Sequence, residues 1–222
     1  MARERARERP TTRLVTPADT GVVRRPADAA LLVAGLGGVL AGMAIVGDGR
    51  MPGWEADLFR AINDLPGALY PALWPFQQLG ALAAGPVLAV VAWLAGRRRL
   101  AVAAGLATVA KLIFERVVKA VVSRQRPATS VGSDIHLRGD VHVTGESFVS
   151  GHAVLVAAFA AIVTPWLPPR WRIVPWIVAG LVMLARVYVG AHNPLDVAAG
   201  AALGLAIGGG LNLLLGVPGR TA

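Results

Sequence analysis

The chain has 222 residues, 55% of them hydrophobic, and a mean hydropathy of +0.58. These values exclude an ordinary water-soluble globular protein, because they lie above what such proteins show. The formal net charge is +9, but the Arg residues near the N-terminus alternate with Glu and have no aromatic neighbours to stack on bases, so we do not expect nucleic-acid binding. The chain has no Cys, which excludes disulfide bonds and thiol chemistry.

The first segment, residues 1–28, is predicted to be a disordered basic tail that touches anionic lipid headgroups. Arg24 and Arg25 precede an apolar run, as they would in a secretory signal. However, Pro26 follows at once, and no small-residue cleavage site comes after the run. We therefore expect the first apolar run to remain in the protein as a membrane span.

Six apolar runs follow, and each is close to the length that a helix needs to cross a bilayer core of about 30 Å. They are residues 29–46, 79–95, 100–122, 150–167, 173–188 and 195–215. A chain in lipid must satisfy its own backbone hydrogen bonds, so the runs predict an all-α polytopic membrane bundle of about six transmembrane helices. This single domain spans residues 29–216, and residues 217–222 form a short tail. In the last run Gly200, Gly204 and Gly208 share one face, which favours close helix packing.

The distribution of Arg predicts the orientation in the membrane, because basic residues in short loops mark the cytoplasmic side. With both termini cytoplasmic, 13 of the 20 Arg fall in the tail, residues 97–99, residues 170–172 and Arg220. Residues 47–78 then lie outside the cell. There, Trp54, Leu58 and Ile62 share one helical face with Leu65, which predicts a segment lying in the outer interface.

The third run ends in charged residues, which are costly inside a membrane and commonly functional. Lys111, Glu115 and Lys119 lie four residues apart on one face, so Glu115 can neutralise a lysine. Lys119 is seven residues before Arg126, which precedes Pro127. The residue before Pro is biased away from helix, so Arg126 should lie just past the helix end and point to the same place as Lys119.

A second cluster stands immediately before the fourth run. Ser150 can cap that helix, and Gly151 leaves the backbone open to a ligand. Free N–H groups at a helix start attract phosphate, and His152 follows in the first turn. Taken alone, this short pattern is equally typical of an ordinary helix cap.

A third cluster precedes the sixth run. Asn193 can cap a helix that begins with Pro194, which places Asp196 in the first turn. There Asp196 can accept a hydrogen bond from the imidazole of His192, which would fix the tautomer and leave the other ring nitrogen free as a nucleophile. A His and Asp pair that only closes a loop is the alternative.

The predicted topology places all three clusters at one membrane face, so their side chains can converge. Their order and spacing resemble the type 2 phosphatidic acid phosphatase family, to which bacterial undecaprenyl-diphosphate phosphatases are related. The family pattern is Lys, six residues, Arg-Pro; then Pro-Ser-Gly-His; then Ser-Arg, five residues, His, three residues, Asp. The matching segments here are residues 119–127, 149–152 and 185–196. Val149 replaces the family's Pro and Ala185 replaces its Ser, which leaves a reduced or specialised activity open.

The resemblance implies a phosphatase reaction with assigned residues. His192 attacks the phosphorus to form a phosphohistidine, and Asp196 orients the imidazole and supports its positive charge. His152 protonates the leaving oxygen and then serves as base for the hydrolytic water. The phosphoryl oxygens are held by Lys119, Arg126, Arg186, Ser150 and the Gly151 amide. Three cations in one site make a metal ion unnecessary, so we expect neither a metal nor another cofactor.

The outer loop between the third and fourth runs carries a further pattern. Asp134 and His136 repeat six residues later as Asp140 and His142, and the alternating polarity predicts a short hairpin. A metal site built from these four side chains is an alternative. Selection of the substrate headgroup by this loop is the role we favour.

The sequence as a whole predicts an integral membrane phosphatase acting at the extracytoplasmic face. Its substrate would be a phosphorylated lipid that arrives laterally, with a polyprenyl diphosphate, phosphatidate or phosphatidylglycerol phosphate as candidates. The alternatives are a lipid phosphotransferase, haloperoxidase-like vanadate chemistry, and a catalytically impaired transporter or scaffold in which the intramembrane charges line a path. The sequence pattern predicts no oligomeric state.

Overall fold

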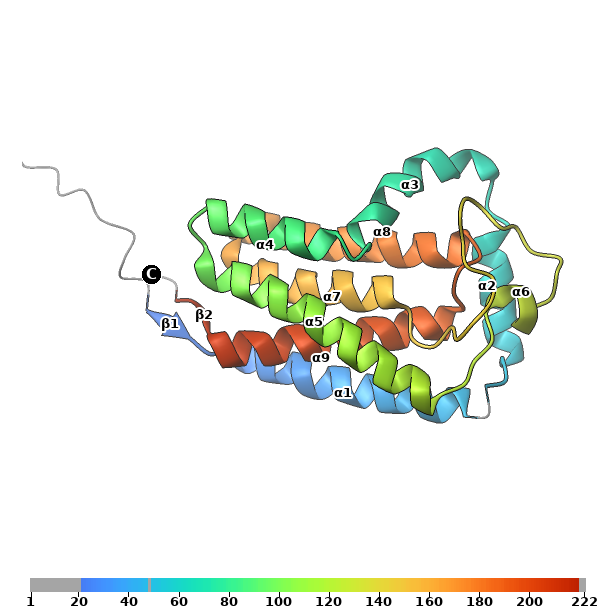
Figure 1. The fold of residues 1–222 in the computed structure, drawn as a ribbon, viewed down its shortest axis with the longest axis horizontal. Helices are drawn as coiled ribbons and strands as arrows, with labels where there is room; N and C mark the ends of the chain where they lie inside the picture. Colours follow the sequence, from blue (N-terminus) through green and yellow to red (C-terminus); the bar gives the residue numbers. More distant parts are fainter. Residues whose placement is uncertain (1–20, 48, 220–222) are drawn as a thin grey trace, which may run out of the picture.

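The chain folds as an all-α bundle in a computed structural model that describes residues 21–47 and 49–219 (Figure 1). The elements in chain order are β1 (Val22–Val23), α1 (Pro26–Val46), α2 (Gly53–Asn63), η1 (Gly67–Leu69), α3 (Tyr70–Leu79), α4 (Ala84–Leu94), α5 (Arg98–Val121), α6 (Pro127–Ser130), α7 (Gly151–Val163), η2 (Thr164–Trp166), η3 (Pro169–Trp171), α8 (Val174–Tyr188), α9 (Pro194–Leu215) and β2 (Val217–Pro218). The long helices lie side by side, while α2 and α6 cover one end of the bundle.

Five of the six predicted runs form helices at their expected places, namely α1, α5, α7 with η2, α8 and α9. Within the described chain, three helices are long and apolar enough to cross a membrane: Pro26–Val46, Pro169–Tyr188 and Pro194–Leu215. The second predicted run, residues 79–95, is different. It joins α3 to α4 through a break with a bend of 65°, and the two together would count as a fourth span.

The break between α3 and α4 has a packing reason. Gly80 follows α3 directly, and a Cβ atom at this position would lie 2.7 Å from Cδ2 of His152 and 3.0 Å from a methyl group of Val182. Only a residue without a side chain fits at such a close approach. The chain therefore turns where it passes the start of α7, which brings α3 over the predicted site.

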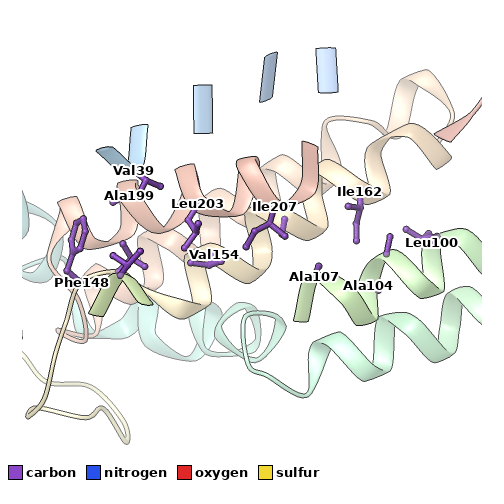
Figure 2. Close-up of a cluster of buried hydrophobic side chains, with 14 of the residues drawn as sticks. Val39, Leu100, Ala104, Ala107, Phe148, Val154, Ile162, Ala199, Leu203 and Ile207 are labelled. Atoms are coloured by element: carbon purple, nitrogen blue, oxygen red, sulfur yellow. The ribbon is translucent and has the colours of Figure 1, made fainter. Parts of the chain in front are cut away.

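The centre of the bundle is α9, which packs against α1, α5 and α7. Figure 2 shows how Leu203 and Ile207 of α9 meet Val154 and Ile162 of α7, with Val39 of α1 on the other side. Small residues make this packing close. The face of Gly200, Gly204 and Gly208 rests directly on α7, as its four-residue spacing predicts, because a Cβ atom at each position would overlap α7 atoms.

The two ends of the bundle differ in the segments that they gather. The α4 to α5 turn and the short antiparallel sheet of β1 and β2 lie at one end, and β2 contacts η2 there. The sheet joins the two described ends of the chain, since the Gly219 N–H donates to the Gly21 carbonyl over 2.7 Å. The tail predicted for residues 1–28 lies mostly outside the described residues; within it, residues 22–23 pair as β1 and α1 begins at Pro26.

The opposite end holds α2, α6 and the outer loop. The predicted amphipathic segment forms α2, in which Trp54 and Leu58 are exposed while Glu55, Phe59 and Asn63 face inward. The hairpin predicted for the outer loop is wrong: residues 131–149 contain no strand. This loop is held instead by Asn63, whose amide bonds the backbone N–H and carbonyl of His136, so its polar groups find partners outside a β ladder.

Two glycines of α1 test the close packing against α9. At Gly35 a new Cβ atom would lie 2.5 Å from the Ala202 carbonyl oxygen and the Ala206 nitrogen, whereas at Gly37 it would meet nothing within 4 Å. We expect Gly35→Ala to destabilise the protein by about 1–3 kcal/mol through overpacking. Gly37→Ala, the matched control, should be neutral or stabilising by up to about 1 kcal/mol. Thermal unfolding of the detergent-purified variants measures both, and equal midpoints would contradict the packing.

Candidate active site

The three predicted clusters converge at the end of the bundle covered by α2. Lys119 lies in the last turn of α5, His152 in the first turn of α7, Arg186 in the last turn of α8, and His192 in the turn between α8 and α9. His152 and Arg186 face a cavity of about 430 Å³. Its other walls come from α3 and the outer loop and are formed by Tyr70, Trp74, Gln77, Gln78 and residues 138–142.

His192 is buried, with 3% of its surface exposed. Its Nδ1 lies 3.1 Å from the carbonyl oxygen of Ser147 and 3.8 Å from Oδ2 of Asp196. The second distance exceeds a hydrogen bond, so the predicted direct bond to Asp196 is absent and the Ser147 carbonyl is the nearest acceptor. A donor bond from Nδ1–H to this carbonyl leaves Nε2 unprotonated, as a nucleophile requires.

Asp196 is held by three donors, none of which is His192. Its Oδ2 accepts bonds from the Ser147 hydroxyl over 2.5 Å and from the Asn193 N–H over 2.8 Å. Its Oδ1 accepts from Arg124 over 2.8 Å. Ser147 therefore contacts both members of the predicted pair, through its carbonyl and through its hydroxyl.

Arg124 and Glu55 are site residues that the sequence reasoning missed. Both side chains are fully buried and paired with each other. Glu55 also accepts the N–H of Leu195 over 2.7 Å, which ties α2 to the first turn of α9. A signal for Arg124 does exist: the segment after α5 is extended, so residues 122, 124 and 126 point inward together.

The predicted cations lie at this end of the bundle and are held by different partners. Arg126 donates to the carbonyls of Ala191 and Thr144, each over 2.9 Å. Arg186 donates to Oε1 of Gln77 over 2.9 Å, a partner from α3 that the sequence did not indicate. Lys119 pairs with Glu115 over 2.9 Å.

Glu115 also pairs with Lys111 over 2.7 Å, as the four-residue spacing predicts. Both partners lie against the start of α7, because a Cβ atom on Gly151 would be 2.6 Å from Oε2 of Glu115 and 2.8 Å from Nζ of Lys111. Any larger residue at Gly151 would push these charged groups away from the site.

Three buried donors lack a hydrogen-bond partner within the described chain. One is Nε of Arg124, and two belong to predicted phosphate-binding residues: the Ser150 hydroxyl and Nε of Arg186. Ser150 occupies the predicted N-cap position of α7, but its side chain makes no capping bond. Buried polar groups without partners are costly, so these two donors indicate space for an oxygen-rich ligand.

Burial lowers the pKa of His192 to about 4, and the positive charges of Arg186 and Arg126 contribute in the same direction. The Asp196 carboxylate raises this pKa, but not enough to offset burial. Burial also lowers the pKa of Arg126 from its ordinary value. His192 is consequently neutral at physiological pH.

The outer loop is fixed over the cavity by Arg138, which donates to the carbonyls of Asn63, Leu65 and Tyr188 and stacks on the Tyr188 ring. Asp140 and His142 of the same loop line the cavity. Nowhere in residues 21–47 and 49–219 do three His, Asp or Glu side chains group as metal ligands.

Comparison with known proteins identifies a family model and a relative that match this chain. Residues 99–216 match the family model described as the PAP2 superfamily. An undecaprenyl-diphosphatase of Sulfolobus acidocaldarius is 31% identical over 163 residues, which cover 72% of this chain and 78% of that protein.

Two solved structures share the fold. The crystal structure of Aquifex aeolicus LpxE has a TM-score of 0.62 and 25% identity, covering 68% of this chain and 90% of that chain. The PAP2 type phosphatidylglycerolphosphate phosphatase of Bacillus subtilis has a TM-score of 0.65 and 21% identity, covering 83% of this chain and 94% of that chain.

The lowered pKa of His192 predicts how stability depends on pH. Above about pH 6.5 the imidazole is neutral in the folded and the unfolded chain, so its contribution to stability is complete. As the pH falls from there toward 4, only the unfolded chain takes up the proton, which destabilises the fold by up to about 3 kcal/mol. The wild type should therefore lose more thermal stability between pH 7 and pH 5 than His192→Ala does.

The exposed His142 supplies the control for this comparison. His142→Ala should follow the wild type across the same pH range in thermal unfolding of detergent-purified protein. Parallel curves for all three proteins would contradict the neutral state of His192 in the fold.

Proposed function

Because this chain belongs to the PAP2 superfamily and is similar to an undecaprenyl-diphosphatase, we propose that it removes phosphate from a lipid through a phosphohistidine on His192. The observation that carries the proposal is a neutral, buried His192 whose Nδ1 lies 3.1 Å from the Ser147 carbonyl oxygen, at the end of the bundle that also holds the unpartnered donors of Ser150 and Arg186. The relative named undecaprenyl-diphosphatase supports a polyprenyl diphosphate as the first substrate to test. Phosphatidate and phosphatidylglycerol phosphate are the other candidates.

The first chemical step forms a nitrogen to phosphorus bond. Nε2 of His192 attacks the phosphorus, and the bond from phosphorus to the leaving oxygen breaks while the proton of His152 moves to that oxygen. His152 lines the same cavity as Arg186, so it lies on the side from which the leaving group departs. In the second step His152 takes a proton from water, the hydroxide attacks the phosphorus, and inorganic phosphate leaves neutral His192 behind.

Negative charge on the transferring phosphoryl oxygens is stabilised by fixed donors. Arg186 and Arg126 supply guanidinium groups, Ser150 its hydroxyl, and Gly151 its amide at the start of α7. Lys119 joins them when the phosphoryl group competes with Glu115 for its ammonium group. Gln77 keeps Arg186 aimed at the site from α3.

The same proposal includes the arrangement in the membrane. Six crossings are made by α1, the bent pair α3 and α4, α5, α7, α8 and α9, within a membrane domain of residues 29–216. The end with α2 faces the extracytoplasmic side, because the α4 to α5 turn with Arg97, Arg98 and Arg99 and the start of α1 with Arg24 and Arg25 lie at the other end. The active site then lies near the outer leaflet, where a phosphorylated lipid arrives by lateral diffusion.

Phosphate release by detergent-purified protein tests the function directly. With EDTA present, the wild type should release phosphate from at least one member of a panel of polyprenyl diphosphate, phosphatidate and phosphatidylglycerol phosphate. His192→Ala should lower kcat by roughly a hundredfold or more, because it removes the nucleophile.

Asp57→Asn, a change at an exposed position of α2, is the matched control and should keep wild-type turnover. A His192→Ala variant that turns over at the wild-type rate would refute the phosphohistidine. Transfer of phosphate to an added lipid alcohol, without release to water, would identify a phosphotransferase instead.

A further inference from the structure

Glu55, Arg124 and Asp196 form a charge cluster whose side chains are wholly shielded from solvent. Arg124 lies between the two carboxylates and is bonded to both. Desolvating three ions is costly, and replacing a buried ion pair with apolar side chains often leaves a protein equally or more stable. Stability of the fold alone therefore does not account for this cluster beside the nucleophile.

Asp196 acts on His192 through its charge rather than through a direct bond. Its carboxylate already accepts three hydrogen bonds, from Ser147, Asn193 and Arg124. The 3.8 Å between its Oδ2 and Nδ1 of His192 is short enough for strong attraction, because both side chains are shielded from solvent. The attraction grows when the imidazole becomes positively charged as it takes the phosphoryl group.

The net charge of Glu55, Arg124 and Asp196 together determines how strongly the cluster attracts the positively charged imidazole. Arg124 alone would cancel the charge of Asp196, and His192 would then face a neutral pair. With both carboxylates the cluster keeps one net negative charge. Glu55 thus restores the charge that Arg124 would otherwise neutralise.

The cations around His192 make the net negative charge of the cluster important. On the phosphate side of His192 the guanidinium groups of Arg126 and Arg186 oppose any positive charge on the ring. Those cations are needed to hold the phosphoryl oxygens, so the compensation must come from the other side. Glu55 is placed there by α2, and its Oε1 is fixed by the N–H of Leu195.

We propose that Glu55, held by Arg124, is a positioning residue for the nucleophile, which keeps the cluster around Asp196 negative and so stabilises the phosphorylated, positively charged imidazole of His192. This inference rests on the proposed phosphatase function. It assigns a role in the chemical step to α2, a helix outside the three sequence motifs.

Glu55→Gln is the first test, because it removes the charge with little change in size. We expect kcat to fall at least about tenfold while KM stays within about twofold of wild type, since the lost interaction forms only as charge develops. Rapid-quench trapping should show that the phosphoenzyme forms more slowly by the same factor. A kcat within twofold of wild type, in protein with a wild-type melting midpoint, would overturn the inference.

Two further variants separate charge from mere structure. The double variant Glu55→Gln with Arg124→Gln leaves Asp196 as the single charge, so the cluster again carries one negative charge. We expect its kcat to exceed that of Glu55→Gln, and a kcat no higher would overturn the inference. Glu55→Asp keeps the charge and serves where Glu55→Gln does not fold. Glu55→Asp should retain kcat within about fivefold of wild type. A larger loss of kcat in folded protein would contradict the proposed role of the charge of Glu55.

The controls distinguish this inference from the proposed function. Asp57→Asn removes an acidic group from the exposed face of the same helix and should leave kcat unchanged. Phosphate release that persists in His192→Ala, or is absent from the wild type with every lipid, refutes the phosphatase itself. Release that requires His192 but is indifferent to Glu55 refutes only the role of the charge cluster.

Discussion

The site depends on one constraint: a buried carboxylate must have its charge and its lone pairs satisfied from within the protein. Asp196 meets this constraint by drawing donors from three segments that are distant in sequence. Arg124 follows α5, Ser147 precedes α7, and Asn193 is the N-cap of α9. The same bonds that compensate the charge therefore hold the three motif segments together around His192, and the position of the nucleophile follows from them.

Most of the helices could be predicted from the sequence, because each apolar run is long and continuous. The start of α9 could also be predicted from the sequence, since Pro194 after Asn193 is a local signal for a first helical turn. The bend between α3 and α4 could not be predicted from a local sequence signal. It lies where Gly80 closely approaches His152, two residues that only the tertiary structure brings together.

The candidate site likewise has parts that the sequence predicts and parts that depend on tertiary contacts. Residues inside short motifs, such as His152 and Arg186, could be proposed from spacing, and the structure places both side chains at one cavity. The hydrogen bond drawn from His192 to Asp196 was wrong, because sequence spacing places two residues on one turn without revealing that Ser147 lies between them. Gln77 was missed for a related reason: a neutral side chain on a separate helix carries no local sign of its partner.

The short sheet of β1 and β2 has a consequence for how the bundle resists force. Because it joins the described ends of the chain at one end of the bundle, tension applied between those ends acts first on four paired residues and then on the contact of α1 with α9. In that geometry the hydrogen bonds between β1 and β2 break one after another rather than together. The helix α1 then separates from α9, starting at its N-terminal end. The site lies at the opposite end of the bundle, where α2 and α9 are bonded through Glu55 and Leu195. The applied force would reach it last.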